Sequence, residues 1–248
     1  MIRVCVAGST GWTGSAIAAA VEAADDLELV AGVSRSSGYP TVAEALDAAP
    51  ADVVVDFTHA AVVKTNVLQA LDRGVGVVVG SSGLTGEDYD EIAERAESQG
   101  VGVIGAGNFS ITAALLLRFA GEAAARFGSW EVIDYASAKK PDAPSGTARE
   151  LAERLDVLGQ KPSLLVPIDE VHGRPEARGA TIGGTQVHSL RLPSFTVSTE
   201  IVFAGSGERL SLRHDAGESA APYVAGALLA VRAVPDVVGL VRGLDRLL

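Results

Sequence analysis

Hydrophobic residues form short, nearly continuous runs over the first part of the chain, and stretches of helical periodicity separate these runs. A run that is apolar at almost every position is typical of a strand buried on both faces of a parallel sheet. The pattern predicts strands at Ile2–Ala7, Leu27–Val33, Val53–Phe57, Val75–Val79 and Val101–Ile104. It predicts helices at Ser15–Ala24, Val62–Leu71 and Glu87–Gln99, the last preceded by Thr85 and Asp88 at capping-box spacing. Strands that alternate with helices indicate βαβ units around a parallel sheet.

The pattern changes after Asn108. Helical periodicity covers Ile111–Phe127 and Ala148–Leu158, and strands are predicted at Trp130–Ala136, Gln186–Leu192, Thr196–Ala204 and Glu208–Asp215. Gly205–Gly207 predicts a hairpin between the last two strands. Strands in series indicate a mixed or antiparallel sheet in a second, α+β domain. We predict a long irregular connection at Gly159–Thr185, and a helical segment at Ala221–Leu248 that returns to the first domain.

Composition narrows the classes of function. The chain of 248 residues has 31 acidic and 20 basic residues and a formal net charge of -11, which repels phosphate backbones and argues against a nucleic-acid partner. The single cysteine, Cys5, is typical of a reducing compartment. The longest apolar run, Val224–Val231, is too short to cross a bilayer, and Ile2–Ala7 is predicted as core rather than as a signal peptide. We expect a cytoplasmic protein without a membrane partner.

A glycine-rich turn lies between the first predicted strand and the first predicted helix. Its glycines, Gly8, Gly11 and Gly14, are spaced GxxGxxG, and Thr10, Trp12 and Thr13 lie between them. Such a turn lets backbone approach a pyrophosphate, and the helix N-terminus attracts the phosphate charge. We therefore predict a Rossmann-like dinucleotide-binding domain, formed by residues 1–108 and 217–248.

The segment Val33–Ser37, at the end of the second predicted strand, is expected to select the ribose. An acid there would bind both ribose hydroxyls and repel a 2′-phosphate. The chain instead has Ser34, which is neutral, and Arg35, which can pair with a phosphate. This favours NADPH, with NADH also possible. The alternative is that Arg35 is a solvated surface charge.

A second candidate site lies between the predicted strand at Trp130–Ala136 and the helix after it. Lys139 and Lys140 lie in the intervening loop, and Ser145, Gly146 and Thr147 open the helix. A cation close to a helix N-terminus makes a carboxylate pocket. The alternatives are a solvated loop and an ordinary capped helix start.

Lys140 followed by Asp142–Ala148 resembles the signature of the dihydrodipicolinate reductase (4-hydroxy-tetrahydrodipicolinate reductase) family of diaminopimelate and lysine biosynthesis. Further segments resemble the family in the same order along the chain: Gly8–Gly14, Asp56–His59, Gly80–Gly83, Ala106–Phe109, Gly183–Arg191 and Arg213–Asp215.

The resemblance implies an NAD(P)H-dependent oxidoreductase that forms a homotetramer. Residues 109–216 would then form the domain for substrate binding and oligomerisation. The implied cofactor contacts beyond the glycine-rich turn are Phe57, Thr58, Gly80, Ser81, Ser82, Ala106, Gly107, Asn108 and Phe109. Lys140, Gly146 and Thr147 would bind a cyclic dicarboxylate, whose unsaturated ring receives a hydride from the nicotinamide and a proton from a side chain.

The chain departs from the family at its proton donors. Ala136 and Ser137 occupy the positions of two adjacent family histidines, and Pro193-Ser194 replaces a Gly-Gly pair. Alanine cannot transfer a proton, and serine is a poor acid at neutral pH. We therefore predict Lys140 as the catalytic acid, alone or with Lys139. The substrate site is predicted to comprise Ser137, Lys140, Ser145, Gly146, Thr147 and His188.

Two other functions are compatible with the sequence. A paralogue that reduces another cyclic imine or a carbonyl acid is favoured by Ala136 and Ser137. A nucleotide-binding protein without catalysis would keep Gly8–Gly14, but it would have no use for Lys140 and Asp142–Ala148. The sequence contains no Cys/His cluster, so we expect no metal site.

Overall fold

The computed structural model describes residues 1–36, 39–164 and 166–248, so Ser37 of the predicted ribose-selecting segment lies outside the described residues. The chain forms two compact units. Unit 1 comprises Met1–Ile111 and Ser219–Leu248, and unit 2 comprises Thr112–Glu218.

Unit 1 contains a six-stranded sheet in the order β11-β5-β4-β3-β1-β2, and every pair in it is parallel. The strands are β1 (Ile2–Ala7), β2 (Leu27–Val33), β3 (Val53–Asp56), β4 (Gly76–Val79), β5 (Gly102–Gly105) and β11 (Gly239–Arg242). All residues of β3, β4 and β5 are buried, as the continuous apolar runs predict. The predicted parallel sheet is confirmed.

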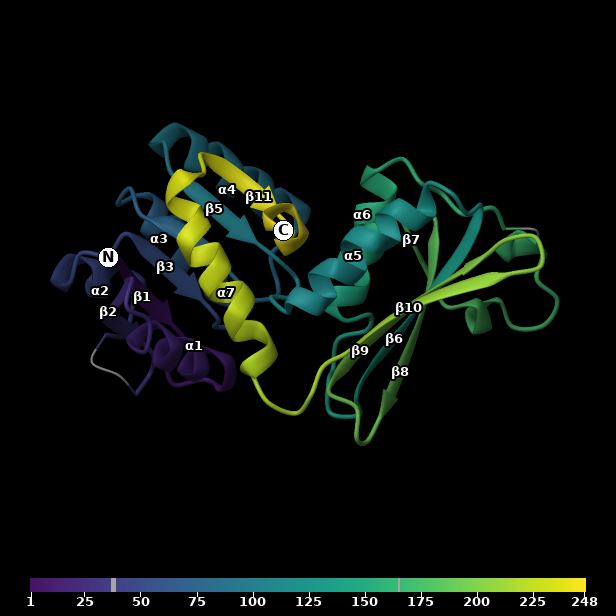
Figure 1. The fold of residues 1–248 in the computed structure, drawn as a ribbon, viewed down its shortest axis with the longest axis horizontal. Coiled ribbons are helices and arrows are strands. Elements are labelled where there is room, and N and C mark those ends of the chain that lie inside the picture. The colour runs from purple at the N-terminus through teal and green to yellow at the C-terminus, as the bar shows by residue number, and fades with distance from the viewer. Residues whose placement is uncertain (37–38, 165) are drawn as a thin grey trace. The chain divides into compact units, whose positions relative to one another are not determined.

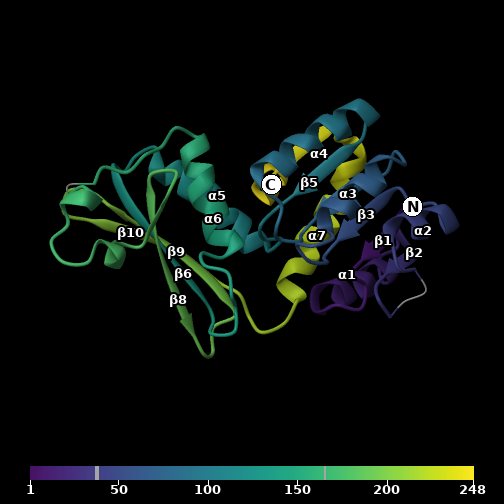
Figure 2. The same ribbon diagram turned by 180° about the vertical axis from the view of Figure 1, so that it is seen from behind.

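Helices cover both faces of this sheet (Figures 1 and 2). They are α1 (Trp12–Glu22), α2 (Val42–Ala48), α3 (Val63–Leu71), α4 (Gly86–Gln99) and α7 (Ala221–Ala233). Helices α1 and α7 pack together on one face, and α2, α3 and α4 lie on the other. The predicted capping box of α4 is confirmed, because Thr85 and Asp88 exchange both hydrogen bonds. Cys5 is buried in the core, and burial raises the pKa of its thiol to about 12.

Two parts of unit 1 differ from the sequence-based prediction. The pattern did not predict α2, which has only seven residues and is capped by Thr41. The prediction that Ala221–Leu248 is wholly helical was wrong. The segment contains α7, a 3-10 turn at Val234–Asp236, strand β11 and a 3-10 turn at Leu244–Leu247. Pro235 cannot continue a regular helix, and Gly239 has a φ of +83°, so the chain turns and pairs with β5 instead.

Unit 2 contains a five-stranded mixed sheet in the order β10-β9-β6-β8-β7. The strands are β6 (Ser129–Ser137), β7 (Ala180–Ile182), β8 (Thr185–Leu192), β9 (Val197–Ala204) and β10 (Arg209–Asp215). The pair β6–β8 is parallel and the other pairs are antiparallel, which confirms the predicted mixed sheet. The irregular connection before β8 is interrupted by β7 and by two 3-10 turns, at Ile168–Glu170 and Pro175–Arg178.

The helices of unit 2, α5 (Ile111–Ala124) and α6 (Gly146–Val157), pack on one face of this sheet (Figure 1). Along β6, buried and half-buried residues alternate at every position. Trp130 and Val132 join the core beneath the two helices, so Asp134 and Ala136 lie on that helix-covered face as well. Glu131, Ile133 and Tyr135 lie on the opposite, open face. This alternation decides where the predicted site residues of β6 and β8 point.

Candidate active site in two units

The glycine-rich turn of unit 1 brings backbone segments into very close approach. Gly8 has a φ of +86°, and a Cβ built on it would lie 2.4 Å from the carbonyl oxygen of Phe57. A Cβ on Gly14, in the first turns of α1, would lie 2.1 Å from the carbonyl oxygen of Gly8. Side chains at either position would push α1 away from the ends of β1 and β3. The glycines thus keep the N-terminus of α1 against the carboxyl ends of these strands.

The N-terminus of α1 lacks the capping groups and acidic residues that are present at the N-terminus of α4. Gly11 is the N-cap of α1 and makes no side-chain cap, and the first turn contains no acidic residue. In α4, by contrast, a capping box occupies the first N–H groups, and Glu87 and Asp88 lie in the first turn. The first turn of α1 therefore presents N–H groups and a partial positive charge to an anion. This arrangement fits the pyrophosphate of a dinucleotide.

Hydroxyl groups gather at the end of β2, where a ribose selector is expected. The Ser34 and Ser36 hydroxyls lie 3.3 Å apart, and Ser36 Oγ donates to Thr10 Oγ1 at 3.4 Å. The backbone N–H of Ser36 donates to Ser34 Oγ at 3.2 Å. The side chain of Arg35 is exposed. The segment thus combines hydroxyls from two loops with a cation and carries no carboxylate.

The predicted residues after β3 and β4 are organised by a buried carboxylate, that of Asp56 at the end of β3. Its Oδ1 accepts hydrogen bonds from Thr58 Oγ1 at 2.7 Å and from Ser81 Oγ at 2.5 Å. Its Oδ2 accepts from Asn66 Nδ2 at 2.8 Å. Sequence reasoning did not select Asp56 as a site residue, although its position at a strand end is the signal that could have done so. Asp56 holds Thr58 and Ser81 together at the carboxyl edge of the sheet.

The remaining predicted cofactor residues lie at the ends of neighbouring strands or just beyond them. Phe57 and Phe109 meet edge to face, with ring centroids 5.5 Å apart. Gly80 follows β4, and its N–H donates to the carbonyl of Asp56 at 2.9 Å. Asn108 is buried, and its Oδ1 accepts from the N–H of Ser110 at 2.8 Å, so this side chain shapes the loop. Among the other predicted cofactor residues, Ala106 is buried, and Ser82, Gly107 and Trp12 are exposed.

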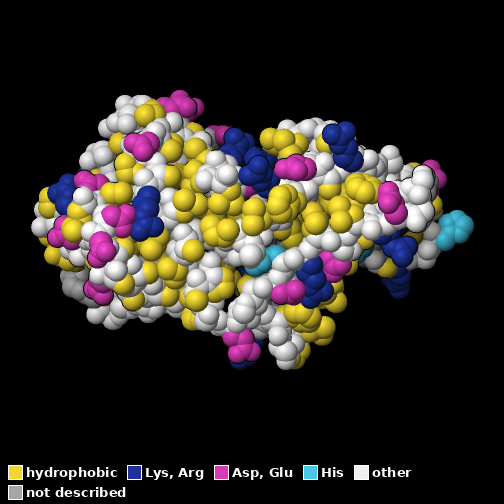
Figure 3. All heavy atoms as spheres, viewed as in Figure 1, with side chains coloured by type: hydrophobic (Ala, Val, Ile, Leu, Met, Phe, Trp, Pro, Cys, Tyr) yellow, Lys and Arg dark blue, Asp and Glu magenta, His cyan; other side chains and the backbone are white. Residues whose placement is uncertain are grey.

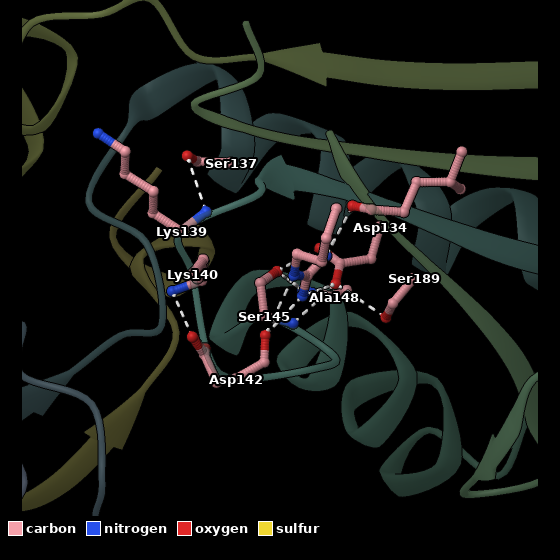
Figure 4. A network of polar contacts seen from close by, with 10 residues as sticks. Asp134, Ser137, Lys139, Lys140, Asp142, Ser145, Ala148 and Ser189 are labelled. Atoms are coloured by element: carbon pink, nitrogen blue, oxygen red, sulfur yellow. Dashed lines mark hydrogen bonds and ion pairs between the residues drawn. The ribbon is translucent and has the colours of Figure 1, made fainter. Parts of the chain in front are cut away.

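In unit 2, Lys140 lies in the loop between β6 and α6 (Figure 4). Its Nζ forms an ion pair with Asp142 Oδ1 at 2.9 Å, and its side chain is 31% exposed. Figure 4 shows the Lys139 side chain pointing away from this pair, and the residue is exposed. The Ser137 hydroxyl accepts from the N–H of Lys139 at 3.3 Å. The two lysines therefore differ, because Lys140 is held within the loop and Lys139 is solvated.

Helix α6 begins at Gly146, and Ser145 is its N-cap, with Ser145 Oγ accepting from the N–H of Ala148. The Ser145 hydroxyl also donates to Asp134 Oδ1 at 2.6 Å, and the residue is 1% exposed. This hydroxyl is fully used by protein groups. The side chain of Ser145, predicted as a substrate contact, thus bonds Asp134 and caps the first turn of α6, which contains Gly146 and Thr147.

The structure does not place His188 beside Lys140 and α6. His188 pairs in register with Ile133, so it lies on the open face of the sheet. Its Nε2 lies 2.7 Å from Glu131 Oε2, and both residues line a pocket of about 510 Å³ on that face. The helix-covered face carries Asp134 and α6 instead. His188 and Asp134 thus lie on opposite faces of the sheet, and only the register of β8 on β6 shows this.

The other histidines have local partners or are exposed. His59 accepts from the N–H of Ala61 at 3.3 Å, and His172 is exposed. His214 Nδ1 lies 3.0 Å from Thr112 Oγ1, and burial lowers the pKa of the imidazole below its ordinary value of 6.5. Ala136 is fully buried on the helix-covered face and offers only a methyl group.

Three further properties bear on partners and on metal binding. On the face shown in Figure 3, basic and acidic side chains are interspersed. None of the helices in the described ranges combines the length and apolar character that a membrane crossing requires. Within residues 1–36, 39–164 and 166–248, no three His, Cys, Asp or Glu side chains are grouped so that they could hold a metal ion.

Comparisons with known proteins cover both units. Residues 2–109 match the family described as "Dihydrodipicolinate reductase, N-terminus", and residues 112–248 match "Dihydrodipicolinate reductase, C-terminus". The chain is 40% identical over 248 residues to the 4-hydroxy-tetrahydrodipicolinate reductase of Mycolicibacterium vanbaalenii, covering 100% of this chain and 99% of the relative. It is 41% identical to that of Nocardia farcinica, covering 98% and 97%.

Solved structures give the same result for the fold. A dipicolinate-bound dihydrodipicolinate reductase from Paenisporosarcina sp. TG-14 matches with a TM-score of 0.82 and 29% identity, with 100% of each chain covered. GenD2 from gentamicin A biosynthesis, in complex with NAD, matches with a TM-score of 0.66 and 18% identity over 99% of this chain and 90% of that chain. The second match is informative for the fold alone.

Proposed function

This chain belongs to the dihydrodipicolinate reductase family, and we propose that it reduces 4-hydroxy-tetrahydrodipicolinate with NADPH, in the diaminopimelate branch of lysine biosynthesis. Membership of the family makes it a pyridine-nucleotide-dependent oxidoreductase. The observation that carries the substrate proposal is the loop from Lys140 to Thr147. This loop carries a lysine that pairs with Asp142, and it leads directly into the N-terminus of α6. Cations and helix N–H groups of this kind bind carboxylates.

The residues of unit 1 fit a dinucleotide. The glycine-rich turn would hold the pyrophosphate against the uncapped N-terminus of α1. Thr58, Ser81 and the residues after β5 would border the nicotinamide. Thr10, Ser34, Arg35 and Ser36 would receive the 2′-phosphate, because hydroxyls and a guanidinium bind phosphate and no carboxylate repels it. This supports NADPH over NADH.

The chain's own groups would orient the substrate and supply the proton. The 4-hydroxyl group of the substrate would leave as water, and the reduced nicotinamide, when bound, would supply a hydride to the unsaturated ring that results. Lys140 is the proton donor in this proposal, because it carries an ammonium group in the loop that precedes α6, while Ala136 carries no ionisable group. A substrate carboxylate would replace Asp142 as the partner of Lys140, and the N–H groups at Gly146 and Thr147 would bind the ring substituents.

We also propose that the chain acts in the cytoplasm as a homotetramer assembled through the open face of the unit 2 sheet. Leu190 and Leu192 on this face are 38% and 48% exposed. With Ile133 and Val202 they form an apolar surface that a second copy would cover. A stable monomer in light scattering at micromolar concentration would contradict this assembly.

One observation favours a second candidate, the reduction of a different cyclic imino acid. Ala136 and Ser137 lack the acid chemistry that the family resemblance implies at those positions. The reaction is tested by following oxidation of NADPH with freshly generated 4-hydroxy-tetrahydrodipicolinate and with a panel of cyclic imino acids. Turnover with the first substrate supports the main proposal. Turnover only with another imino acid selects the second candidate, and no oxidation with any compound contradicts both.

A further inference from the structure

A buried carboxylate lies directly behind the proposed substrate loop. Asp134 is 0% exposed. Its Oδ2 accepts from the N–H of Ser145 at 2.8 Å and from Ser189 Oγ at 3.1 Å, while its Oδ1 accepts from Ser145 Oγ at 2.6 Å (Figure 4). A carboxylate in such a place is stable only when it is paired and saturated with hydrogen bonds. The cation that pairs with it therefore belongs to the same hydrogen-bond network.

That cation is Arg191 on β8, whose Nη2 donates to Asp134 Oδ2 at 2.8 Å. The same guanidinium reaches the substrate loop, because Nη2 and Nε donate to the carbonyl of Asp142 at 2.6 and 3.2 Å. Its Nη1 donates to the carbonyl of Leu190 at 2.9 Å. Arg191 thus connects the buried carboxylate with the backbone of the loop that carries Lys140.

The pair holds the second half of the loop, at Asp142 and at Ser145. Asp134 fixes Ser145, the N-cap of α6, through its N–H and its hydroxyl. Arg191 fixes Asp142, the ion-pair partner of Lys140. One fixed residue pairs with Lys140, and the other is the N-cap of α6.

The charge of the pair matters as much as its geometry. A carboxylate bonded to the N-cap residue of α6 competes with an external anion for the positive end of the helix. Arg191 neutralises that carboxylate at short range. Its planar guanidinium donates hydrogen bonds both to the carboxylate of Asp134 and to the carbonyl of Asp142. Without Arg191, a buried negative charge would stand behind the site that must accept a dicarboxylate.

We infer that Arg191 is a positioning residue for the substrate site. It neutralises the charge of Asp134 and fixes the loop. As a result, no unpaired carboxylate lies behind the first turn of α6 when a dicarboxylate binds there. This inference rests on the proposed function. It predicts that Arg191 affects the affinity for a dicarboxylate and does not affect the affinity for the dinucleotide.

The test measures the affinity for dipicolinate, an unreactive dicarboxylate, by calorimetry in the presence of NADPH, together with KM for the substrate. Arg191→Met should weaken dipicolinate binding and raise KM by about ten-fold to a hundred-fold, the size of a charge-assisted contact. Asp134→Asn, which removes the charge, should have a much smaller effect. The double variant D134N/R191M should bind dipicolinate better than Arg191→Met alone, because no unpaired carboxylate is left.

A purely structural role predicts a different order. The two single variants would then lose affinity alike, and the double variant would be the worst, which would overturn the inference. Arg191→Lys keeps the charge but loses the planar guanidinium, so its dipicolinate affinity should lie between those of wild type and Arg191→Met. This variant replaces Arg191→Met in the test if Arg191→Met does not fold. Arg118→Met, which removes an exposed arginine from α5, is the matched control for net charge. NADPH affinity and the melting temperature report folding.

The outcome for the wild-type protein separates this inference from the proposed function. If wild type binds dipicolinate and the Arg191 variants bind it equally well, the inference is wrong and the proposed function stands. If wild type binds no dicarboxylate, the proposed substrate class fails, and the inference fails with it.

Discussion

The indole of Trp12 and the ring of Tyr223 meet edge to face in unit 1, with their centroids 5.9 Å apart. Trp12 is the first residue of α1, at the glycine-rich turn, and Tyr223 lies in the first turn of α7. The contact therefore connects α7 with the glycine-rich turn. Trp12 is still 56% exposed, whereas Trp130, the other tryptophan of the chain, is 3% exposed and lies in unit 2.

This difference predicts an intrinsic fluorescence signal for cofactor binding. We expect NADPH to quench the emission of Trp12, because the reduced nicotinamide of a dinucleotide bound at Gly8–Gly14 accepts the excitation energy of the nearby indole. Trp12→Phe should remove most of the titratable change, while the emission of buried Trp130 persists. A titration of both proteins with NADPH measures this. An equal change in the variant would show that the dinucleotide does not bind beside α1.

The second prediction concerns cofactor choice. A charge-assisted hydrogen bond to a phosphate contributes about 1.5–3 kcal/mol, which is about ten-fold to a hundred-fold in affinity. Arg35→Ala should therefore weaken NADPH binding by this factor and leave NADH binding unchanged, since NADH has no 2′-phosphate. Arg35 is exposed, so the variant should fold normally. Equal or tighter binding of NADH by the wild-type protein would contradict the proposed preference.

How much of the structure can be predicted from the sequence depends on how far apart in the chain the interacting residues lie. Strands β1 to β5 of unit 1 were predictable because burial on both faces leaves a continuous apolar run. Strand β11 was missed because it has only four residues, and its strand conformation depends on pairing with β5, far away in the sequence.

The same limit applies to the candidate site. Gly8–Gly14 and Lys140 could be identified from local motifs. The bond between Asp134 and Arg191 joins residues that are 57 positions apart, so no local pattern indicates it. For His188, the motif indicated a role, but only the register of β8 on β6 shows that the side chain lies on the open face.

The third prediction concerns stability and pH. Burial lowers the pKa of His214 in the folded state, so the unfolded chain binds more protons than the folded chain below the ordinary value of 6.5. The neutral imidazole is compatible with the fold above that pH, and stability falls as the pH drops below 6.5 towards the lowered pKa. His214→Asn can keep a hydrogen bond to Thr112 and does not titrate.

Thermal denaturation of both proteins between neutral and mildly acidic pH measures this effect. The melting temperature of the variant should fall less steeply on acidification than that of wild type. Parallel curves for the two proteins would mean that His214 is not the group responsible.

The last prediction concerns the proton donor and separates Lys140 from its neighbour. Lys140 forms an ion pair with Asp142 in the loop that precedes α6, and the fully buried Ala136 has no ionisable group. Lys140→Ala should therefore abolish turnover with any accepted substrate, a loss of at least the ~10²–10⁴-fold typical of a general acid. NADPH affinity should stay within about two-fold, because the dinucleotide contacts proposed here all lie in unit 1.

Lys139→Ala is the matched control, since it removes the same charge from the same loop. Its side chain is exposed and points away from the ion pair in Figure 4, so it should cost far less activity. The pH dependence of kcat distinguishes a proton donor from a residue that only binds carboxylate, because a missing acid also removes the alkaline limb of the profile. If Lys140→Ala retained wild-type turnover while Lys139→Ala lost it, Lys139 would be the acid. Unchanged turnover in both variants would remove the loop from the chemistry altogether.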